Sequence, residues 1–381
     1  MRVVLNLIPV QSGGGLQQAV NLLTFLADLD ESTRACWLIL VSKNGPLHKW
    51  LEKKSILKFE AFKYDYINYF LIGRKSILKS VNRFSPDIVF HFTATWRGVE
   101  VPQVVRSVYS NLYFPEIEFW SRRPFLSFLK KKIIDWFRLR GTLRADGLIF
   151  ENRAMQQRSH ELFSYPIDRT RYIKPSSANY VPGDLRLVDR GKRAGAFTIL
   201  YLSSWYRNKN IHILPDVAAI LHNRGIPVRF RLSLDRNHPE VARDIIAKSG
   251  ALGVEDYFEL LGTIPPSEVP SYIMSSDSMI LLSKLECFSS NIVEAWTFKR
   301  PLIVSNEDWA TSECADAALY VNRSDCGSIA DGIAKLAADP ELCDDLVTRG
   351  TLKLLELNTP EEKGRQQMEF LEKIWRAGKK D

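Results

Sequence analysis

This 381-residue sequence has few cysteines and no long apolar run, and each scarcity excludes a class of protein. The five cysteines form no C-x-x-C pair and are odd in number, at positions 36, 287, 314, 326 and 343. A disulfide framework is therefore not expected, and a reducing cytosol fits. No window reaches about 18 apolar residues without a charge, so no membrane-spanning helix is predicted. Residues 1–10 lack the basic flank and the length of a signal peptide, and we expect none there.

The overall composition is that of a globular protein. Hydrophobic residues make up 45% of the chain and charged residues 25%, which excludes wholesale disorder and fibrous repeats. At about 100 to 200 residues per domain, the length predicts two or three domains, each large enough to bury its own core.

Positive charge is concentrated in the first half of the chain. Residues 1–190 contain 29 Lys and Arg against 17 Asp and Glu, whereas the remainder contains 23 against 27. The formal net charge of +8 therefore arises entirely in the first half. This asymmetry suggests that one half faces an anionic partner, either a nucleic acid or the headgroups of a membrane leaflet.

Apolar runs of strand length alternate with segments of helical periodicity along both halves of the chain. The first run, residues 2–9, is followed by Ser12–Gly15 and by a helical segment that starts at Leu16. This order indicates a strand, a glycine loop and a helix, and its repetition predicts parallel sheets of βαβ units. Further strands are expected at residues 36–41, 86–92, 197–202, 228–232, 257–262, 278–282 and 301–304, with helices at 210–224, 239–249 and 361–377.

A polar, glycine-containing stretch at residues 182–195 is the expected linker between two α/β domains. We assign residues 1–183 to an N-terminal domain and residues 192–358 to a C-terminal domain. Residues 359–381 are expected to form a final helix that returns to the N-terminal domain.

Residues 283–296, Ser-Lys-Leu-Glu-Cys-Phe-Ser-Ser-Asn-Ile-Val-Glu-Ala-Trp, follow a predicted strand and open a helix. The segment resembles the E-G-F-x-x-x-x-x-E-A motif of retaining glycosyltransferases in the glycogen-synthase-like GT4 family (group 1). The resemblance implies the GT-B fold, in which two Rossmann-like domains face each other across a cleft. The first domain would bind the acceptor and the second the nucleotide sugar. Cys287 stands where the family usually has glycine, and Asn291 where proline is common.

The residue types in this segment suit a nucleotide sugar. A helix N-terminus offers unpaired N–H groups and a partial positive charge, which suit a diphosphate. Glu294, in the first turn, can hold two ribose hydroxyls, and by resemblance Glu286 contacts the sugar hydroxyls and orients the anomeric carbon. The N–H groups would come from four consecutive residues: Ser289, Ser290, Asn291 and Ile292.

A structural explanation of the same segment stays open. The spacing E-x7-E occurs three times in this chain, so it proves nothing by itself. Asn291–Glu294 also has the pattern of an ordinary capping box, in which Glu294 would only close the N-terminus of its own helix.

The loop after the strand at 197–202 contains two candidate cations. In the family, the equivalent loop carries an Arg and then a Lys that neutralise the departing diphosphate, and Lys209 is similar to that Lys. The family Arg is Ser204 here, and Arg207 is the candidate substitute. The alternative is that these basic residues at a strand–helix turn are simply solvated.

Three further resemblances lie in other loops. Gly14 and Gly15 resemble a glycine loop that lets backbone approach the donor phosphate, although the order G-x-G-x-x-G is absent and a tight turn without ligand is the alternative. His91 ends a predicted strand, where the family often has a His whose ring or backbone touches the donor sugar; a structural His is the alternative. Thr263 follows Gly262 in a loop that resembles the one reading the nucleobase edge.

Residues 122–144 combine eight Lys and Arg with one acid, Asp135, and with apolar residues at helical spacing. Such a segment can lie in a membrane interface, with its apolar stripe in the acyl boundary and its cations on anionic headgroups. The alternative is a core-packing helix with a solvated basic face. No nucleic-acid partner is expected, because no RNP, zinc-finger or helix-turn-helix pattern occurs.

The resemblance implies a retaining, metal-independent enzyme without a cofactor, in which Glu286, Lys209 and His91 take part in catalysis. The donor would be a UDP-, GDP- or dTDP-linked hexose, and the acceptor a lipid-linked glycan or an oligosaccharide, as in the synthesis of a bacterial surface polysaccharide or lipopolysaccharide. We expect a cytoplasmic protein held at the inner face of the plasma membrane. A GT-B sugar epimerase and a non-catalytic, sugar-nucleotide-binding adaptor remain alternatives.

Overall fold

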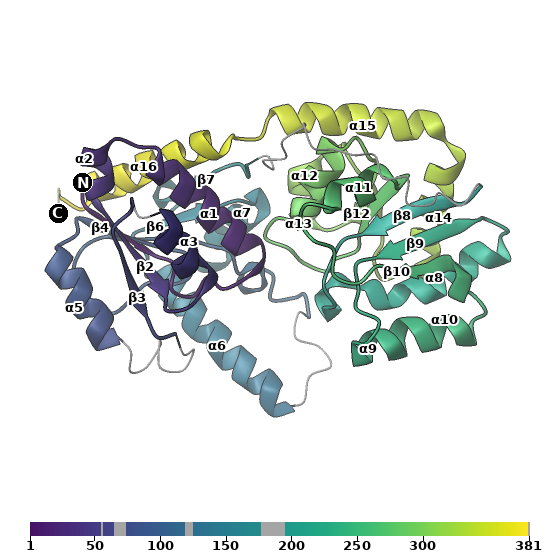
Figure 1. The fold of residues 1–381 in the computed structure, drawn as a ribbon, viewed down its shortest axis with the longest axis horizontal. Coiled ribbons are helices and arrows are strands. Elements are labelled where there is room, and N and C mark those ends of the chain that lie inside the picture. The colour runs from purple at the N-terminus through teal and green to yellow at the C-terminus, as the bar shows by residue number, and fades with distance from the viewer. Residues whose placement is uncertain (55, 65–73, 119–124, 177–194, 380–381) are drawn as a thin grey trace. The chain divides into compact units, whose positions relative to one another are not determined.

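The computed structural model describes residues 1–54, 56–64, 74–118, 125–176 and 195–379. Most of the expected linker at residues 182–195 lies outside the described residues, as do Arg122 and Arg123 of the basic stretch. The chain forms two compact units, shown in Figure 1. One contains Met1–Pro115, Arg122–Ser176 and Asn358–Asp381, and the other contains Glu116–Ser121 and Ser177–Leu357. We call them the N-terminal and the C-terminal unit.

The N-terminal unit is built on a parallel sheet, whose described strands run in the order β3-β2-β1-β4-β5-β6-β7. Its strands are β1 (Val3–Asn6), β2 (Trp37–Ser42), β3 (Phe59–Phe62), β4 (Ile88–His91), β5 (Gln103–Arg106), β6 (Gly147–Phe150) and β7 (Thr170–Tyr172). Its helices are α1 (Gly13–Ala27), α2 (Glu31–Ala35), α3 (Pro46–Lys54), α5 (Arg74–Phe84), η1 (Ser110–Leu112), α6 (Phe125–Leu143), α7 (Arg153–Phe163), η2 (Ile167–Arg169) and α16 (Pro360–Ala377).

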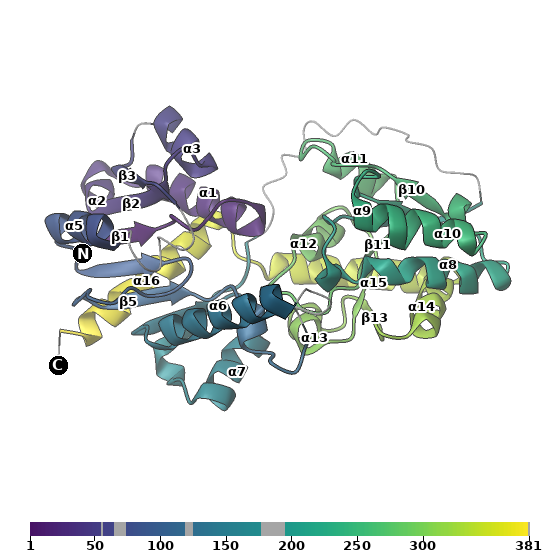
Figure 2. The same cartoon turned by 90° about the horizontal axis from the view of Figure 1, so that it is seen from below.

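Apolar side chains bury both faces of this sheet. Val3 and Leu5 of β1 pack with α1 and α16 in one core cluster, while Val4, between them, packs with α5 in another. Figure 2 shows α16 beside the strands of this unit, although it is the last helix of the chain. Burial on both faces explains why the strands are continuous apolar runs rather than alternating ones.

The C-terminal unit repeats the plan with a parallel sheet in the described order β10-β9-β8-β11-β12-β13. Its strands are β8 (Phe197–Tyr201), β9 (Val228–Leu232), β10 (Phe258–Leu260), β11 (Ser278–Leu281), β12 (Leu302–Ser305) and β13 (Leu319–Val321). Its helices are η4 (Arg207–Lys209), η5 (Ile211–Ile213), α8 (Leu214–Asn223), α9 (Pro239–Val241), η6 (Ala242–Ala247, π-helical), α10 (Lys248–Ala251), η7 (Glu255–Tyr257), α11 (Val269–Met274), α12 (Ser290–Thr297), α13 (Asp308–Cys314), α14 (Cys326–Ala338) and α15 (Pro340–Leu355). The predicted α/β fold of two Rossmann-like domains is confirmed.

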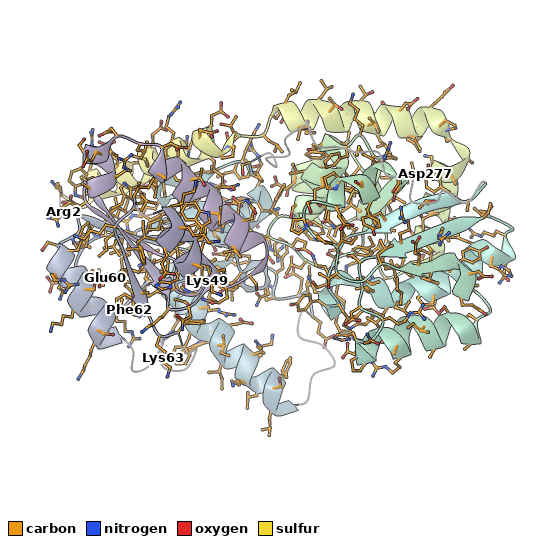
Figure 3. The ribbon with its side chains drawn as sticks, in the orientation of Figure 1. Arg2, Lys49, Glu60, Phe62, Lys63 and Asp277 are labelled. Atoms are coloured by element: carbon orange, nitrogen blue, oxygen red, sulfur yellow. The ribbon has the colours of Figure 1, made fainter. Side chains whose placement is uncertain are left out.

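An aspartate joins the central strands of each sheet at their amino-terminal ends. In the N-terminal unit the backbone N–H of Arg2 donates to Asp87 Oδ2 at 2.7 Å, just before β1 and β4. In the C-terminal unit the N–H of Thr198 donates to Asp277 Oδ2 at 2.9 Å, at the start of β8 and β11. Arg2 and Asp277 are labelled in Figure 3. Both sheets therefore fix the same pair of neighbouring strands in the same way.

Two helical predictions differ from the structure. Gly13–Gly15, predicted as a loop, form the first turn of α1, and the loop instead covers Leu7–Ser12. Gly13 has φ +69°, a left-handed conformation that glycine adopts without steric cost, so the chain can turn directly into the helix. The helix predicted at 239–249 exists, but its middle turn at η6 is π-helical.

Helix α6 covers the part of the basic stretch that the structure describes. In this helix Phe128, Ile134, Leu139 and Leu143 are half-buried, whereas Leu126, Leu129, Ile133, Trp136 and Phe137 are exposed. Core packing therefore accounts for only part of its apolar side chains. Of the helices in the described parts of the chain, none is long and apolar enough to cross a membrane.

Candidate functional site

The strand order of each sheet reverses at one point, and this position predicts where a ligand binds. Strands are added in one direction from β8 to β9 and β10, and in the other direction from β11 to β12 and β13. In open parallel sheets, ligands bind outside the carboxyl ends of the strands at such a switch point. In the C-terminal unit, the two loops at this point cover residues 202–210, after β8, and residues 282–289, after β11.

Lys209 and Glu286 meet at this switch point. Lys209 Nζ donates to Glu286 Oε1 at 2.5 Å, although 77 residues separate them in the chain. Their side chains are 21% and 15% exposed, so the ion pair is shielded but still reachable from solvent. An ammonium group has three N–H donors, so Lys209 can hold Glu286 and a second anion at once.

Hydrogen bonds hold these two loops together independently of the ion pair. Asn208 Nδ2 donates to the carbonyl of Leu285 at 2.7 Å, and the N–H of Lys284 donates to the carbonyl of Asn208 at 2.8 Å. The buried hydroxyl of Tyr201 donates to the carbonyl of Lys209 and accepts from the N–H of Leu282 at 3.1 Å. These bonds fix the backbone that carries Lys209 and Glu286.

Asn210 completes the loop after β8. It has φ 57°, in the left-handed region that asparagine tolerates better than most residues. Its Nδ2 donates to the carbonyl of Arg323 at 2.6 Å. Asn210 therefore stabilises the backbone turn that follows Lys209.

Helix α12 begins beside the same loops. Its N-cap is Ser289, which is extended and makes no side-chain capping bond, and the helix starts at Ser290, which is exposed. Asn291 Nδ2 donates to the carbonyl of Leu202 at 2.7 Å, which ties α12 to the end of β8 and accounts for asparagine here. The side chain of Ile292 is buried, and its N–H already donates to the carbonyl of Ser289 at 3.1 Å, so the predicted role of Ile292 as a phosphate donor is not supported.

Glu294 lies one turn further into α12 than predicted. With Ser289 as N-cap, Glu294 is the fifth helical residue, outside the first turn. The alternative explanation, a capping box starting at Asn291, does not hold, because Asn291 is inside the helix and its side chain bonds Leu202. The half-buried Glu294 side chain is therefore not a helix cap.

Arg207 does not join the Lys209–Glu286 pair. Its Nη2 donates to Asp244 Oδ2 at 2.5 Å, and its Nε lies 3.5 Å from Glu240 Oε2. Glu240 also accepts a bond from Trp205 Nε1 at 2.5 Å. The pKa of Asp244 is lowered by its hydrogen bond to Arg243, with a further contribution from Arg207. Two carboxylates thus hold the guanidinium toward α9 and η6.

Thr263 lies in the loop after β10 and is exposed. Gly262, before it, has φ +71° and donates its N–H to the carbonyl of Leu234 at 3.1 Å. Strand β9 separates β10 from β8, so Thr263 is displaced along the sheet from the ion pair.

The N-terminal unit has its own switch point, between β1 and β4. Gly14 and Gly15 lie after β1, in the first turn of α1, and no atom is within 4 Å of where a Cβ would stand on either residue. Ser12, the N-cap, makes no side-chain capping bond. The backbone of this turn is therefore approachable, as a phosphate-binding turn requires.

His91, at the end of β4, is completely buried and has a hydrogen-bond partner at each ring nitrogen. Asn6 Nδ2 lies 3.0 Å from Nδ1, and Gln103 Oε1 lies 3.0 Å from Nε2. The ring also packs edge-on against Trp96. Burial lowers the pKa of His91 to about 3, so the ring is neutral at pH 7. Because the imidazole has no solvent-exposed surface that a sugar could contact, a structural role for His91 is favoured.

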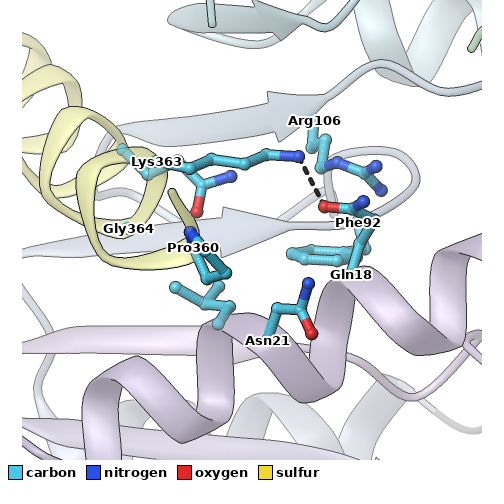
Figure 4. Close-up of a pocket in the computed structure, with 9 residues that line it drawn as sticks. Gln18, Asn21, Phe92, Arg106, Pro360, Lys363 and Gly364 are labelled. Atoms are coloured by element: carbon cyan, nitrogen blue, oxygen red, sulfur yellow. Dashed lines mark hydrogen bonds between the residues drawn. The ribbon is translucent and has the colours of Figure 1, made fainter. Parts of the chain in front are cut away.

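A buried charge cluster in the N-terminal unit was missed from the sequence. Glu151, after β6, accepts from Arg106 Nε at 2.6 Å and lies 2.7 Å from Lys363 Nζ of α16. Lys363 also donates to Gln18 of α1 at 2.5 Å beside a small hollow, seen in Figure 4. No local pattern signals this cluster, because its members lie up to 257 residues apart in the sequence.

The architecture defines the class: two parallel-sheet, Rossmann-like units of the GT-B fold. Residues 188–353, less than half of the chain, match the family model of glycosyl transferases group 1. The chain is 24% identical over 203 residues to an alpha-D-kanosaminyltransferase from Streptomyces kanamyceticus. That alignment covers 51% of this chain and 52% of the relative, so the chain matches about half the length of that curated protein.

Solved structures share the whole fold. HepE from Anabaena, determined with UDP and glucose, has a TM-score of 0.69 at 15% identity, covering 98% of this chain and 100% of that one. WaaG, a glycosyltransferase involved in lipopolysaccharide biosynthesis, has a TM-score of 0.66 at 13% identity, covering 96% and 98%. At such identities the similarity is one of fold.

Proposed function

We propose that this protein is a retaining, metal-independent glycosyltransferase that moves a hexose from a nucleotide sugar to a lipid-linked or oligosaccharide acceptor. The single observation that carries the proposal is the Lys209–Glu286 pair at the switch point of the C-terminal sheet, beside the start of α12. The match of residues 188–353 to the group 1 family supports it.

The donor diphosphate would lie between Lys209 and the N-terminus of α12. The N–H groups at residues 289–291 would supply hydrogen bonds, and the helix would add the positive end of its dipole. Lys209 adds a full charge where negative charge develops on the leaving diphosphate, and such stabilisation acts most strongly in the transition state. These groups would take the place of a divalent ion.

Glu286 and Glu294 would hold the two other parts of the donor. Glu286, oriented by its ion pair with Lys209, would accept hydrogen bonds from the sugar hydroxyls. Glu294, one turn into α12, would accept hydrogen bonds from the ribose hydroxyls. In the front-face route, the departing phosphate takes the proton of the acceptor hydroxyl as the new bond forms on the same face of the sugar. No protein carboxylate is then needed as a covalent nucleophile.

The nucleobase of the donor and the class of acceptor are proposed from similarity alone. HepE was determined with UDP, and WaaG is involved in lipopolysaccharide biosynthesis. A UDP-linked hexose is therefore the first donor to test, before GDP- and dTDP-sugars. A bacterial surface glycan in a cytoplasmic, membrane-associated pathway is the acceptor class that fits.

A thermal-shift screen with UDP-glucose, GDP-mannose, dTDP-glucose and ADP-glucose tests donor binding. One of them should raise the melting temperature in the presence of EDTA, and Lys209→Ala should make the shift smaller. Lys248→Ala is the matched control, because Lys248 forms an equally short 2.5 Å pair with Asp216 away from the switch point. A shift that appears only with Mg²⁺ or Mn²⁺ would contradict the metal-free mechanism.

Turnover separates transfer from the alternatives. A transferase releases free nucleoside diphosphate only when an acceptor is added, here a lipid extract or an oligosaccharide pool. A new nucleotide sugar formed without acceptor would identify an epimerase. A protein that binds the nucleotide sugar but forms no product, with or without acceptor, would be an adaptor.

A further inference from the structure

Helix α6 carries an unusual set of exposed side chains. Five large apolar residues have 45–78% of their surface exposed: Leu126, Leu129, Ile133, Trp136 and Phe137. Five of the twelve exposed large apolar residues in the described chain thus lie on this one helix. Scattered exposed apolar residues are normal, whereas a cluster of this size marks an interaction surface.

The five residues form one continuous stripe. At about 100° per residue, their positions on the helix fall within an arc of about 100°. Trp136 and Phe137 stand edge to face, with ring centroids 4.9 Å apart, at the C-terminal part of the stripe. We call this surface the α6 stripe.

The side chains that border the α6 stripe are basic. Lys130 and Lys132 are exposed and lie on opposite sides of it, and the exposed Arg140 stands 4.4 Å from the ring centroid of Trp136. The helix has one acid, Asp135, which lies on the opposite side and is buried. The exposed face of α6 is therefore apolar and cationic, without a carboxylate.

The inward side of α6 carries buried polar and small residues together with four half-buried apolar residues, Phe128, Ile134, Leu139 and Leu143. Asp135 accepts from Asn111 at 2.8 Å, and the carbonyl of Gly141 accepts from the hydroxyl of Thr95 at 2.5 Å. The buried residues of the described part of α6 are Asp135, Gly141 and Thr142. A surface helix normally turns its large apolar residues inward, and here five of them point outward.

We propose that the α6 stripe docks the protein on an anionic lipid leaflet. An apolar stripe with Trp and Phe, bordered by Lys and Arg, is the pattern of a helix that lies in the headgroup–acyl boundary. The cations select an anionic surface, in agreement with the excess of basic residues in the first half of the chain. The proposal is independent of the catalytic proposal, because it concerns binding to lipid alone.

Vesicle flotation with the full-length protein tests the docking. Wild type should bind phosphatidylcholine vesicles that contain phosphatidylglycerol, bind pure phosphatidylcholine poorly, and lose binding as NaCl rises. Lys130→Glu/Lys132→Glu/Arg140→Glu should lower the partition coefficient about a hundredfold or more. The matched control is Lys53→Glu/Lys75→Glu/Lys79→Glu, which makes the same charge change at exposed positions of α3 and α5 and should have a much smaller effect.

A second variant tests the apolar side chains of the α6 stripe separately from the basic side chains that border it. Leu126→Asn/Ile133→Asn/Phe137→Asn keeps every cation and should also lose vesicle binding. Leu352→Asn/Leu355→Asn, at two exposed leucines of α15, is its control and should bind like wild type. Melting temperatures like that of wild type in all four variants would show that they fold.

Three results would overturn the docking proposal. The first is equal binding to neutral vesicles at high salt. The second is unchanged binding of the stripe variant and of the α6 charge variant. The third is a wild-type protein that does not bind vesicles and sediments as a dimer, while the stripe variant sediments as a monomer. That result would identify the α6 stripe as an interface between two copies.

Discussion

At the amino-terminal edge of each sheet, the two units join their central strands in the same way. At the carboxyl-terminal edge, the two units carry different side chains. At the amino edge, Asp87 and Asp277 each bond the N–H of the neighbouring strand. At the carboxyl edge, the N-terminal unit encloses a neutral, fully buried His91. The C-terminal unit instead leaves a Lys209–Glu286 pair within reach of solvent.

This difference separates groups that stabilise the fold from groups that can meet a ligand. Buried polar groups must have partners, and His91, Glu151 and Arg106 have them within the N-terminal unit. Lys209 and Glu286 keep part of their surface, so their charges can act on a bound anion. Substitutions in the buried groups should therefore lower stability, and substitutions in the exposed pair should lower ligand binding or turnover.

The largest expected effect is on stability. Glu151→Ala should lower the free energy of unfolding by about 3–5 kcal/mol, because it leaves Arg106 and Lys363 as buried cations without their carboxylate. Denaturant unfolding measures the loss. Glu372→Ala is the control, since Glu372 pairs with the well-exposed Arg376 on the surface of α16 in the same unit, and its loss should cost under about 1 kcal/mol. Similar losses in both variants would remove the distinction between buried and exposed charge.

Lys209→Ala should show the opposite profile. We expect kcat to fall about 100-fold or more, because the lost charge acts on the leaving diphosphate, while the melting temperature changes little. Steady-state kinetics and a melting curve on the same preparation give both values. Arg207→Ala is the comparison, since two carboxylates already hold its guanidinium. If Arg207→Ala loses more activity than Lys209→Ala, the leaving-group role belongs to Arg207.

The third prediction concerns pH. The pKa of His91 is about 3 in the folded protein and about 6.5 when exposed, so below pH 6.5 the unfolded chain takes up a proton that the folded chain does not. Stability should therefore fall as pH drops from 6.5 toward 3, by at most about 1.4 kcal/mol per pH unit from this group. The pH dependence of the unfolding midpoint should be shallower between pH 6.5 and 4.5 in His91→Gln. An unchanged slope would mean that His91 is not buried as described.

The smallest effect is expected at Glu294. Glu294→Gln should weaken nucleoside diphosphate binding about tenfold, because a neutral amide is a poorer acceptor for ribose hydroxyls than a carboxylate. Calorimetric titration measures this change, and the melting temperature of the free protein should stay constant. A lower melting temperature with unaltered affinity would assign Glu294 a structural role.

Patterns within a few residues predicted most of the fold. The strand predicted at 228–232 coincides with β9, and the helix predicted at 361–377 starts one residue late relative to α16. Strands β3, β5, β6, β7 and β13 were not predicted. Each has only three or four residues, but so do β1 and β4, which lie in longer apolar runs of the sequence. Local patterns identify long, strongly periodic elements better than short buried ones.

The features that the sequence did not predict depend on contacts between residues that are far apart in the chain. The acids that hold Arg207 lie 33 and 37 residues after it, and the partners that bury His91 lie on β1 and β5. The alternative capping box from Asn291 to Glu294 matched a local pattern, whereas the Asn291 amide bonds the carbonyl of Leu202, which lies 89 residues earlier in the chain. The outward direction of the α6 stripe also depends on the packing of α6 through Asp135 and Gly141, which no local pattern reveals.

Hydrogen exchange, followed by mass spectrometry with and without the bound nucleoside diphosphate, tests the central claim most directly. UDP, GDP, dTDP and ADP would each be added to the full-length protein in EDTA. For the nucleotide that binds, we expect slower exchange in peptides covering residues 203–210 and 283–294, and weaker protection in Lys209→Ala. Protection that is absent from both peptides and appears only at the end of β4, around residues 88–96, would contradict the assignment of the donor site to the C-terminal unit.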